Sequence, residues 1–173
     1  MTIFVISDTH FNHEGILKFK DYLNKPCRQF DSVDQMNQCM LDNWNDTVGP
    51  KDTVIHCGDV LFGLDKVDWL TANFAKLPGK KRLVLGNHDN PKHLAPFFKD
   101  IHMWIDMSDK GFLFSHTPQH PSTLAESHRF GTGKVLNVHG HIHTNPSPEG
   151  PYKCVCVEQT NFTPVDIETL HAG

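Results

Sequence analysis

The sequence predicts a mixed α/β domain in which two β-sheets pack together and helices lie outside them. Two observations support this fold class. In the first half of the 173-residue chain, short apolar runs alternate with segments of helical periodicity. In the second half, short strand-like runs follow one another with turns between them. A layered arrangement places both halves around one core, and the length fits a single domain over residues 1–173.

Three strands are predicted in the first half of the chain. They are TIFVIS (2–7), DTVIHCGD (52–59) and KRLVLGNHD (81–89), and each is a β-rich run that leads into polar residues. Between them, residues 31–48 and 64–77 have apolar side chains every three or four positions, which predicts two helices. Asp31 or Ser32 could cap the first helix. The two stripes consist of Val33, Met36, Met40, Leu41 and Trp44, and of Val67, Leu70, Phe74 and Leu77.

The second half contains four strand candidates. They are MWIDMS (103–108), GFLFSH (111–116), KVLNVHGH (134–141) and YKCVCVEQ (152–159). Residues 109–111, Asp-Lys-Gly, form a plausible tight turn. Residues 116–133 show little periodicity and many turn-forming residues, so we expect a long surface loop there.

Composition narrows the function classes. The formal net charge of -4 offers no basic surface for extended nucleic acid, although bound metal ions could still attract a phosphorylated ligand. The N-terminal MTIFVISDTH lacks the features of a signal peptide, and no apolar run approaches membrane-spanning length. The five cysteines are scattered without a CxxC pair. We therefore expect reduced thiols, mostly in the core, and a cytoplasmic protein.

Five short blocks share one plan, an apolar run followed by residues that bind metals. They are SDTH (7–10), CGDV (57–60), GNHD (86–89), FSHT (114–117) and HGHIH (139–143). Loops at the ends of strands in layered α/β folds converge on one crevice. Such convergence would gather Asp8, His10, Asp59, Asn87, His88, His116, His141 and His143.

This set of side chains suits divalent metal ions. It offers carboxylates, imidazoles and an amide oxygen but no thiolate, which favours Mn²⁺, Zn²⁺, Fe²⁺, Ni²⁺ or Co²⁺. The donors are too many for one structural zinc ion and suffice for two ions that share a carboxylate. Two ions about 3.5–4 Å apart can clamp a phosphoryl group and activate water for in-line attack.

Local spacing suggests how some of these side chains are presented. Asp8 and His10 alternate, as do the histidines of VHGHIHT, and alternate residues of an extended strand share one face. Asn87 follows Gly86 and could occupy a turn in a left-handed conformation. Gly140 would let the backbone approach the site.

The ordered motifs DTH, GD, GNHD, SH and GHIH resemble those of the calcineurin-like metallophosphoesterase superfamily. SDTHFNHE, WN-x-x-VGPKDTV and VEQTNFTPVDIETL resemble small bacterial and phage-type members in particular, so the resemblance covers essentially the whole chain. It implies a four-layer αββα sandwich and a binuclear phosphoesterase, with Mn²⁺ the foremost metal.

The resemblance also implies a role for each matching position. Asp8, His10 and His143 would hold one metal ion, Asn87, His116 and His141 the other, and Asp59 would bridge them. His88 would contact substrate and protonate the leaving oxygen, a task that suits a group titrating near neutral pH. Asp89 would orient His88.

Four further histidines keep open roles. His56 lies within a strand run, which favours a structural role. His13 follows the first motif closely and could touch substrate. His120 lies in the predicted loop, where solvation is the ordinary state, and His139 could support the site or fill its strand.

Other enzyme classes fit these motifs less well. Amidohydrolases use HxH near the first strand of a barrel of roughly 200 residues or more, and zinc deaminases need H-x-E with P-C-x-x-C; neither pattern fits. Protein phosphatases carry DRG and GNHE, where this chain has GDVLFG and GNHD. A non-catalytic scaffold of the same fold is the remaining alternative, although no expected ligand is missing.

The substrate would be a small phosphomonoester or phosphodiester, with nucleotides and cyclic nucleotides included. Residues 11–25 and 117–133 would line its pocket, and the sequence predicts neither a monomer nor an oligomer.

Overall fold

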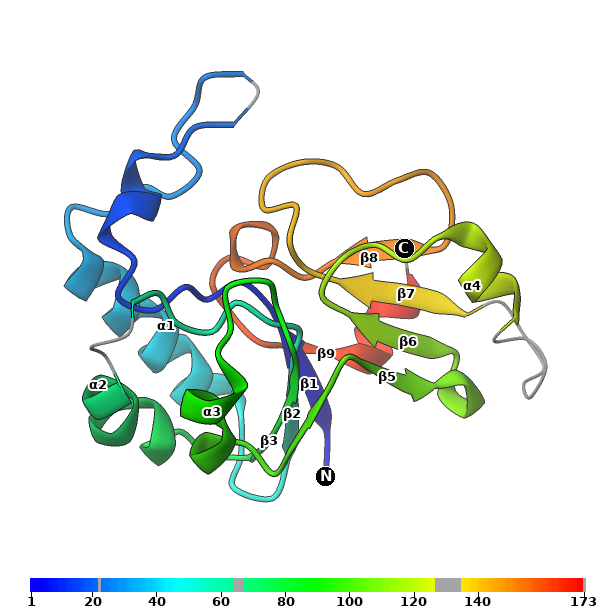
Figure 1. The fold of residues 1–173 in the computed structure, drawn as a ribbon, viewed down its shortest axis with the longest axis horizontal. Helices are drawn as coiled ribbons and strands as arrows, with labels where there is room; N and C mark the ends of the chain where they lie inside the picture. Colours follow the sequence, from blue (N-terminus) through cyan, green and yellow to red (C-terminus); the bar gives the residue numbers. More distant parts are fainter. Residues whose placement is uncertain (22, 64–66, 127–134, 173) are drawn as a thin grey trace.

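The computed structural model describes residues 1–21, 23–63, 67–126 and 135–172 of the chain. These residues form two mixed β-sheets with helices on their outer sides (Figure 1). The predicted mixed α/β class with two packed sheets is therefore confirmed. Among the described residues, no helix combines the length and the apolar character needed to cross a bilayer.

The first sheet has five strands in the order β4-β3-β2-β1-β9. Neighbours from β1 to β4 pair in parallel, whereas β9 runs antiparallel to β1. The strands are β1 (Ile3–Ile6), β2 (Thr53–His56), β3 (Lys80–Val84), β4 (Asp100–His102) and β9 (Val165–Asp166). The sequence predicted β1, β2 and β3 but not the two edge strands, which have only three and two residues.

The second sheet has four strands in the order β5-β6-β7-β8. They are β5 (Trp104–Met107), β6 (Phe112–Ser115), β7 (Leu136–His139) and β8 (Tyr152–Cys154). β5 and β6 form an antiparallel hairpin, and β6, β7 and β8 are parallel. The predicted turn between β5 and β6 is confirmed, because Gly111 adopts a left-handed φ of 81° and its N–H donates to the Ser108 carbonyl. The predicted strand 152–159 is shorter than expected, since a 3₁₀ helix follows it.

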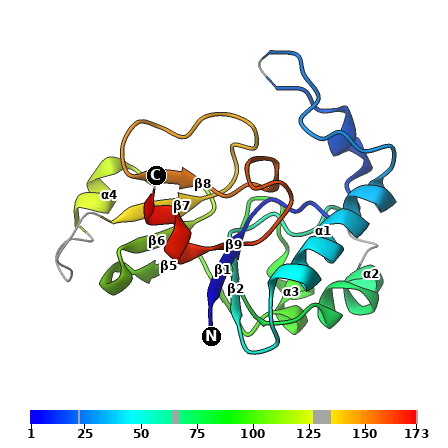
Figure 2. The ribbon, with the colours of Figure 1, turned by 180° about the vertical axis from the view of Figure 1, so that it is seen from behind.

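Alternation along the strands separates two cores. Phe4 of β1 and Val54 of β2 point toward the helices, whereas Val5 and Ile55 point toward the second sheet. There they pack with apolar side chains of β5, β6 and β7, including Phe112, Phe114 and Val138. The two sheets therefore face each other across an apolar layer, and the N-terminal strand β1 lies between β2 and β9 in the first sheet (Figure 2).

Four α-helices are described: α1 (Val33–Thr47), α2 (Val67–Ala72), α3 (Pro91–Leu94) and α4 (Pro121–Glu126). The 3₁₀ helices are Glu14–Lys18, Phe74–Lys76, Ala95–Phe97, Ser108–Lys110, Val157–Gln159 and Ile167–Ala172. Ser32 caps α1 by accepting the Gln35 N–H. The predicted stripe of α1 packs on the first sheet with Val33 only partly buried, and buried side chains such as Leu41 each stabilise the fold by about 1.5–3 kcal/mol.

The expected helix over 64–77 is wrong as a continuous element. Within the described part, α2 ends at Ala72 and a 3₁₀ helix covers Phe74–Lys76, while residues 64–66 lie outside the described residues. Asn73 stands at the break, where both its backbone N–H and its side-chain amide donate to the Trp69 carbonyl. The buried stripe itself is right, because Leu70, Phe74 and Leu77 all belong to the core.

The expected loop over 116–133 is also corrected. α4 begins at Pro121, and its Leu124 packs with Leu113 and Val135 on the outer face of the second sheet. Proline at the first helical position favours such a start. Residues 127–133 of the predicted loop lie outside the described residues. Since α1 and α2 cover the opposite side, the layers run helix, sheet, sheet, helix (Figure 1).

Candidate metal centre

The carboxyl ends of strands from both sheets meet at one place. Asp8, Asp59 and Asn87 follow β1, β2 and β3 of the first sheet, and His116 follows β6 of the second. His141 and His143 follow β7. The five predicted loops therefore do converge, and the structure gathers the candidate side chains into two adjacent groups.

Left-handed backbone, rather than strand alternation, presents most of these side chains. The φ angles are 57° at Asp8, 45° at His10, 56° at Asp59, 72° at His141 and 51° at His143. β1 ends at residue 6 and β7 at residue 139, so the predicted common strand face is wrong. Asp and His tolerate the left-handed region better than most residues, which makes such turns feasible here.

Asn87 shows the reverse difference. We expected a left-handed conformation for it, but it does not occur among the residues with positive φ. Its exposed side chain nevertheless reaches the site, with Oδ1 2.9 Å from Nε2 of His116.

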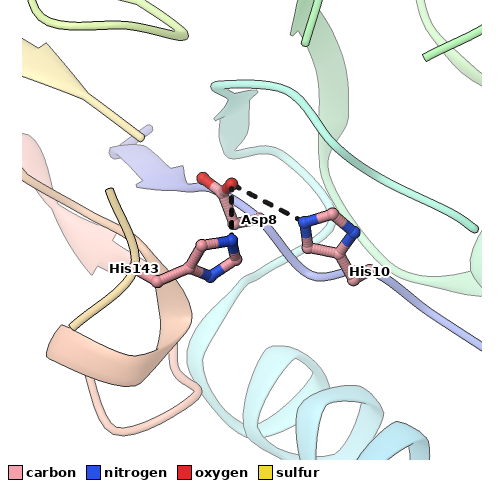
Figure 3. Close-up of side chains that lie close together, drawn as sticks. All are labelled: Asp8, His10 and His143. Atoms are coloured by element: carbon pink, nitrogen blue, oxygen red, sulfur yellow. Dashed lines mark ion pairs between the residues drawn. The ribbon is translucent and has the colours of Figure 1, made fainter. Parts of the chain in front are cut away.

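The first group consists of Asp8, His10 and His143 (Figure 3). Oδ1 of Asp8 lies 3.8 Å from Nε2 of His10 and 3.9 Å from Nε2 of His143. These separations exceed hydrogen-bond lengths. Atoms bound to one divalent ion at about 2.1 Å each lie about 3–4 Å apart, so the separations fit a shared ion. Oδ1 of Asp8 and both ring nitrogens of His10 are buried without a hydrogen-bond partner among the described residues.

The other oxygen of Asp8 is firmly held. Oδ2 accepts the Ser7 hydroxyl at 2.6 Å, the His141 backbone N–H at 2.8 Å and the Cys156 thiol at 3.2 Å. Three donors on one oxygen fix the rotation of the carboxylate. Oδ1 is thereby directed at the two histidines of its group.

Charge around Asp8 also favours its ionised form. Burial raises the pKa of Asp8, but the neighbouring imidazoles of His10, His116 and His143 outweigh burial and lower it well below its usual value. An ionised carboxylate with an unpartnered oxygen is a strong ligand for a divalent ion.

The second group consists of Asp59, His116 and His141, with Asn87 beside it. Nδ1 of His116 lies 2.8 Å from the Cys57 carbonyl, to which it donates, so Nε2 is the ring nitrogen that faces the group. That Nε2 lies 3.2 Å from Nδ1 of His141. Two ring nitrogens this close require a proton or a metal ion between them.

Asp59 lies between the two groups. Its Oδ2 is 3.5 Å from Nε2 of His10 and 3.5 Å from Nε2 of His116. Its Oδ1 accepts the His88 backbone N–H at 2.9 Å, which orients the carboxylate. One oxygen is thus shared between a histidine of each group.

Two glycines permit the close approach of these loops. A Cβ on Gly140 would overlap the side chains of Ser7 and Asp8, and a Cβ on Gly86 would overlap Asp59. The prediction that Gly140 allows backbone approach is therefore confirmed.

Asp89 has a different partner from the one we predicted. Its carboxylate accepts the backbone N–H groups of Gly86 and Asp59 through Oδ2 and that of Val60 through Oδ1, each at 2.9 Å. Within the described residues it makes no hydrogen bond to the His88 ring. Asp89 therefore ties the β2 and β3 loops together, and the predicted orientation of His88 by Asp89 is wrong.

His88 is exposed at the rim of the site. Its ring centroid lies 5.7 Å from that of His10 and 5.6 Å from that of Phe62. His13 lies on the same side, stacked on Phe62 with centroids 3.8 Å apart, and its Nδ1 accepts the Ile16 N–H. Burial and the neighbouring His10 lower the pKa of His13 to about 4, so it is neutral near pH 7.

The remaining open histidines belong to neither group. Buried His56 accepts the Gly58 N–H at Nδ1 and meets the Thr9 hydroxyl at Nε2, contacts that favour a structural role. His139 is buried beside the Gly140 carbonyl and Ser147. His120 is exposed, as expected for a solvated residue.

Two cavities border the site. One of about 530 Å³ has His143 in its wall together with Phe19 and Lys20. The other, of about 200 Å³, is lined by Phe62 and His88. The first cavity is lined by five residues of the predicted stretch 11–25, whereas the described residues of 117–133 line neither cavity; the five are Ile16, Lys18, Phe19, Lys20 and Asp21.

Sequence reasoning missed Arg28 and Glu158. Glu158 accepts a hydrogen bond from His143, and Arg28 pairs with Glu158. Glu158 belongs to VEQTNF, where an acid beside a buried valine was an available signal. Arg28 lies in a polar segment without periodicity, where nothing marked it.

The donor set fits divalent metal ions, because it combines carboxylates, imidazoles and an amide oxygen with buried atoms that have no other partner. Comparisons with known proteins agree. The chain is 31% identical over 175 residues to an uncharacterized protein of Methanocaldococcus jannaschii, covering 97% of this chain and 88% of that protein. It is 31% identical over 171 residues to the gene 66 protein of Mycobacterium phage L5, covering 80% of this chain and 75% of that protein.

A solved structure has the same fold. It is the protein of unknown function AQ665 from Aquifex aeolicus, which is 29% identical, aligns over 99% of this chain and 98% of its own, and gives a TM-score of 0.75. The model of the calcineurin-like phosphoesterase superfamily domain matches residues 1–156, a stretch that contains both groups of donors. The chain therefore belongs to the calcineurin-like phosphoesterase superfamily.

Proposed function

We propose that this protein is a binuclear metal-dependent phosphoesterase that hydrolyses a small phosphomonoester or phosphodiester. Asp8, His10 and His143 would hold one ion, and Asn87, His116 and His141 the other, with Asp59 bridging them. Mn²⁺ is the foremost metal, and Zn²⁺, Fe²⁺, Ni²⁺ and Co²⁺ also suit the donors. The five unpaired cysteines favour the reducing cytoplasm as its compartment.

The position of Asp59 is the observation that carries the proposal. A single oxygen, Oδ2, is equally distant from a histidine of each group. A carboxylate between two sets of nitrogen donors is what a pair of ions needs if they are to share a ligand. One structural ion would use four donors and leave the others unexplained.

The residues of the chain divide the chemical work. Two bound divalent ions would supply a nucleophilic hydroxide near neutral pH and would neutralise the phosphate charge. His88 stands exposed beside the first group, where its ring can give a proton to the leaving oxygen. The stacked pair Phe62–His13 and the exposed ring of Phe19 form an aromatic wall there, which favours a substrate with a flat group such as a nucleoside.

The first experiment measures metal content and activity together. Protein stripped with a chelator is loaded with Mn²⁺, Ni²⁺ or Zn²⁺, and its metal content is determined by elemental analysis. It is then assayed with phosphomonoesters, phosphodiesters and nucleotides. We expect two ions per chain and hydrolysis that depends on them. Metal binding without hydrolysis of any ester would favour the non-catalytic scaffold instead.

Asp59→Ala tests the shared ligand. We expect it to abolish hydrolysis, because both ions lose a donor, whereas His120→Ala serves as an exposed histidine control with wild-type activity. Turnover at the wild-type rate in metal-supplemented Asp59→Ala would contradict the two-metal assignment.

A further inference from the structure

Arg28 and Glu158 form a buried ion pair beside the first group of donors. Nε of Arg28 lies 2.8 Å from Oε1 of Glu158, and the two side chains are 0% and 1% exposed. An ion pair at this depth is costly to bury unless its further hydrogen bonds are satisfied.

Arg28 also holds the backbone that presents Asp8 and His10. Its Nη2 donates to the Asp8 carbonyl at 2.6 Å, and its Nη1 donates to the Thr9 carbonyl at 2.9 Å. These two peptide units belong to the left-handed stretch after β1. The planar guanidinium offers its donors in a fixed fork, so it can fix two successive carbonyl groups at once.

Glu158 controls the third member of the group. Its Oε1 lies 2.9 Å from Nδ1 of His143. A carboxylate that accepts from Nδ1–H selects the tautomer with a free lone pair on Nε2, and Nε2 is the atom that faces Oδ1 of Asp8. In Figure 3, dashed lines join the Asp8 carboxylate to the rings of both His143 and His10.

We propose that Arg28 and Glu158 are positioning residues that set the geometry and the affinity of the first metal site while leaving the second site largely unchanged. The inference rests on the proposed metal-binding function. One arginine reaches all three members of the first group, since it touches Asp8 directly, His10 through the Thr9 peptide and His143 through Glu158. Among the described residues, no hydrogen bond joins Arg28 or Glu158 to Asp59, Asn87, His116 or His141.

Glu158→Gln is the decisive variant, because it keeps the size and an acceptor oxygen but removes the charge. Loss of a carboxylate behind a metal-binding histidine typically weakens metal affinity about 10–100-fold. We expect a Mn²⁺ titration followed by calorimetry to show one site weakened by that factor and one site at wild-type affinity. Arg28→Lys keeps the charge but loses the fork, and it should weaken the same site.

Asp100→Asn provides a matched control. Asp100 also lies between an arginine and a histidine, with Arg82 Nε at 2.8 Å and His102 Nε2 at 3.1 Å, but this triad is on β3 and β4 away from the donors. Loss of the Asp100 charge should leave both metal affinities unchanged.

Glu158→Ala adds a readout that needs no metal. Without the acceptor, ¹⁵N NMR of the metal-free protein in alkaline solution should show that the single Nδ1–H tautomer of His143 is lost.

The outcomes separate this inference from the proposed function. Wild-type affinity at both sites in folded Glu158→Gln and Arg28→Lys, with folding checked by circular dichroism, would overturn the positioning role alone. A lowered melting temperature with unchanged metal affinities would assign the pair to stability and overturn it equally. Absence of metal binding in the wild-type protein would overturn both proposals. Selective weakening of one site would support the positioning role even if no substrate were hydrolysed.

Discussion

The backbone N–H of His141 donates to Oδ2 of Asp8 at 2.8 Å, across 133 positions of sequence. One carboxylate therefore does two things. Its Oδ1 faces the other members of the first group, while its Oδ2 anchors the loop that brings His141 to the second group. The Asp8 carboxylate thus belongs to the first proposed site and also holds the backbone of a proposed ligand of the second.

Removal of the Asp8 carboxylate should therefore affect both sites. Asp8→Gly suits the left-handed backbone but removes a donor of the first site and the anchor of His141. We expect metal content to fall to one ion per chain or less, with weakened affinity at both sites. His10→Gly removes a donor of the first site only and is the matched comparison. Titration with Mn²⁺ would argue against coupling if Asp8→Gly kept one site at wild-type affinity.

His88→Ala should separate metal binding from proton transfer. The ring lies beside the first group without belonging to it, so we expect both ions to bind as in the wild type. Loss of a general acid should lower kcat by roughly 10²–10⁴-fold for esters with poor leaving groups, and less for 4-nitrophenyl esters. Elemental analysis and steady-state kinetics check both parts. Loss of metal together with rate would move His88 into the ligand set.

Phe62→Ala should change substrate preference. The Phe62 ring is 40% exposed, stacks on His13 and lines the cavity that contains His88. An aromatic contact is worth about 0.5–1.5 kcal/mol, so KM for esters of aromatic alcohols should rise roughly 2–10-fold. KM for glycerol phosphate should change little. Trp104→Ala, at another exposed aromatic residue, is the control. An equal change in KM for aromatic esters and for glycerol phosphate would contradict the proposed contact between Phe62 and the substrate.

His56 should make the metal-free protein sensitive to acid. Burial lowers the pKa of His56 from 6.5 to about 3. Below pH 6.5, His56 binds a proton in the unfolded chain but not in the folded protein. The free energy of unfolding therefore decreases as the pH falls from 6.5 toward 3. Each unit of difference between the folded and unfolded pKa corresponds to about 1.4 kcal/mol.

Urea unfolding in the presence of a chelator measures this effect. The free energy of unfolding of His56→Gln should depend less steeply on pH in that interval than that of the wild type. His120→Gln, at an exposed position, should follow the wild type. Parallel pH curves for wild type and His56→Gln would show that acid acts through other groups.

Much of the site could be predicted from the sequence because its donors stand in short motifs after apolar strands. Asp8, Asp59 and His116 lie at the ends of strands that the pattern identified. The conformation of these residues could not be predicted in the same way. Alternation describes an extended strand, whereas Asp8 and His10 lie beyond the last residue of β1 in left-handed turns.

The supporting residues were harder still, because their partners are distant in sequence. Arg28 meets Glu158 across 130 positions, and a polar stretch gives no sign that one of its arginines is buried. Asp89 adjoins His88 in sequence, which suggested that it orients the ring. The fold instead directs its carboxylate to the backbone of Asp59 and Val60.

The left-handed turns at five proposed ligand positions affect how long the folded protein lasts in the cell. Each costs a residue other than glycine about 1 kcal/mol, with less expected for Asp and His. Glycine would make the fold more stable at these positions. The Asp and His donors there therefore lower the stability of the metal-free protein. A bound ion offsets the strain in proportion to the logarithm of its free concentration. Metal supply would then govern how long each molecule survives unfolding and proteolysis, as well as how fast it works.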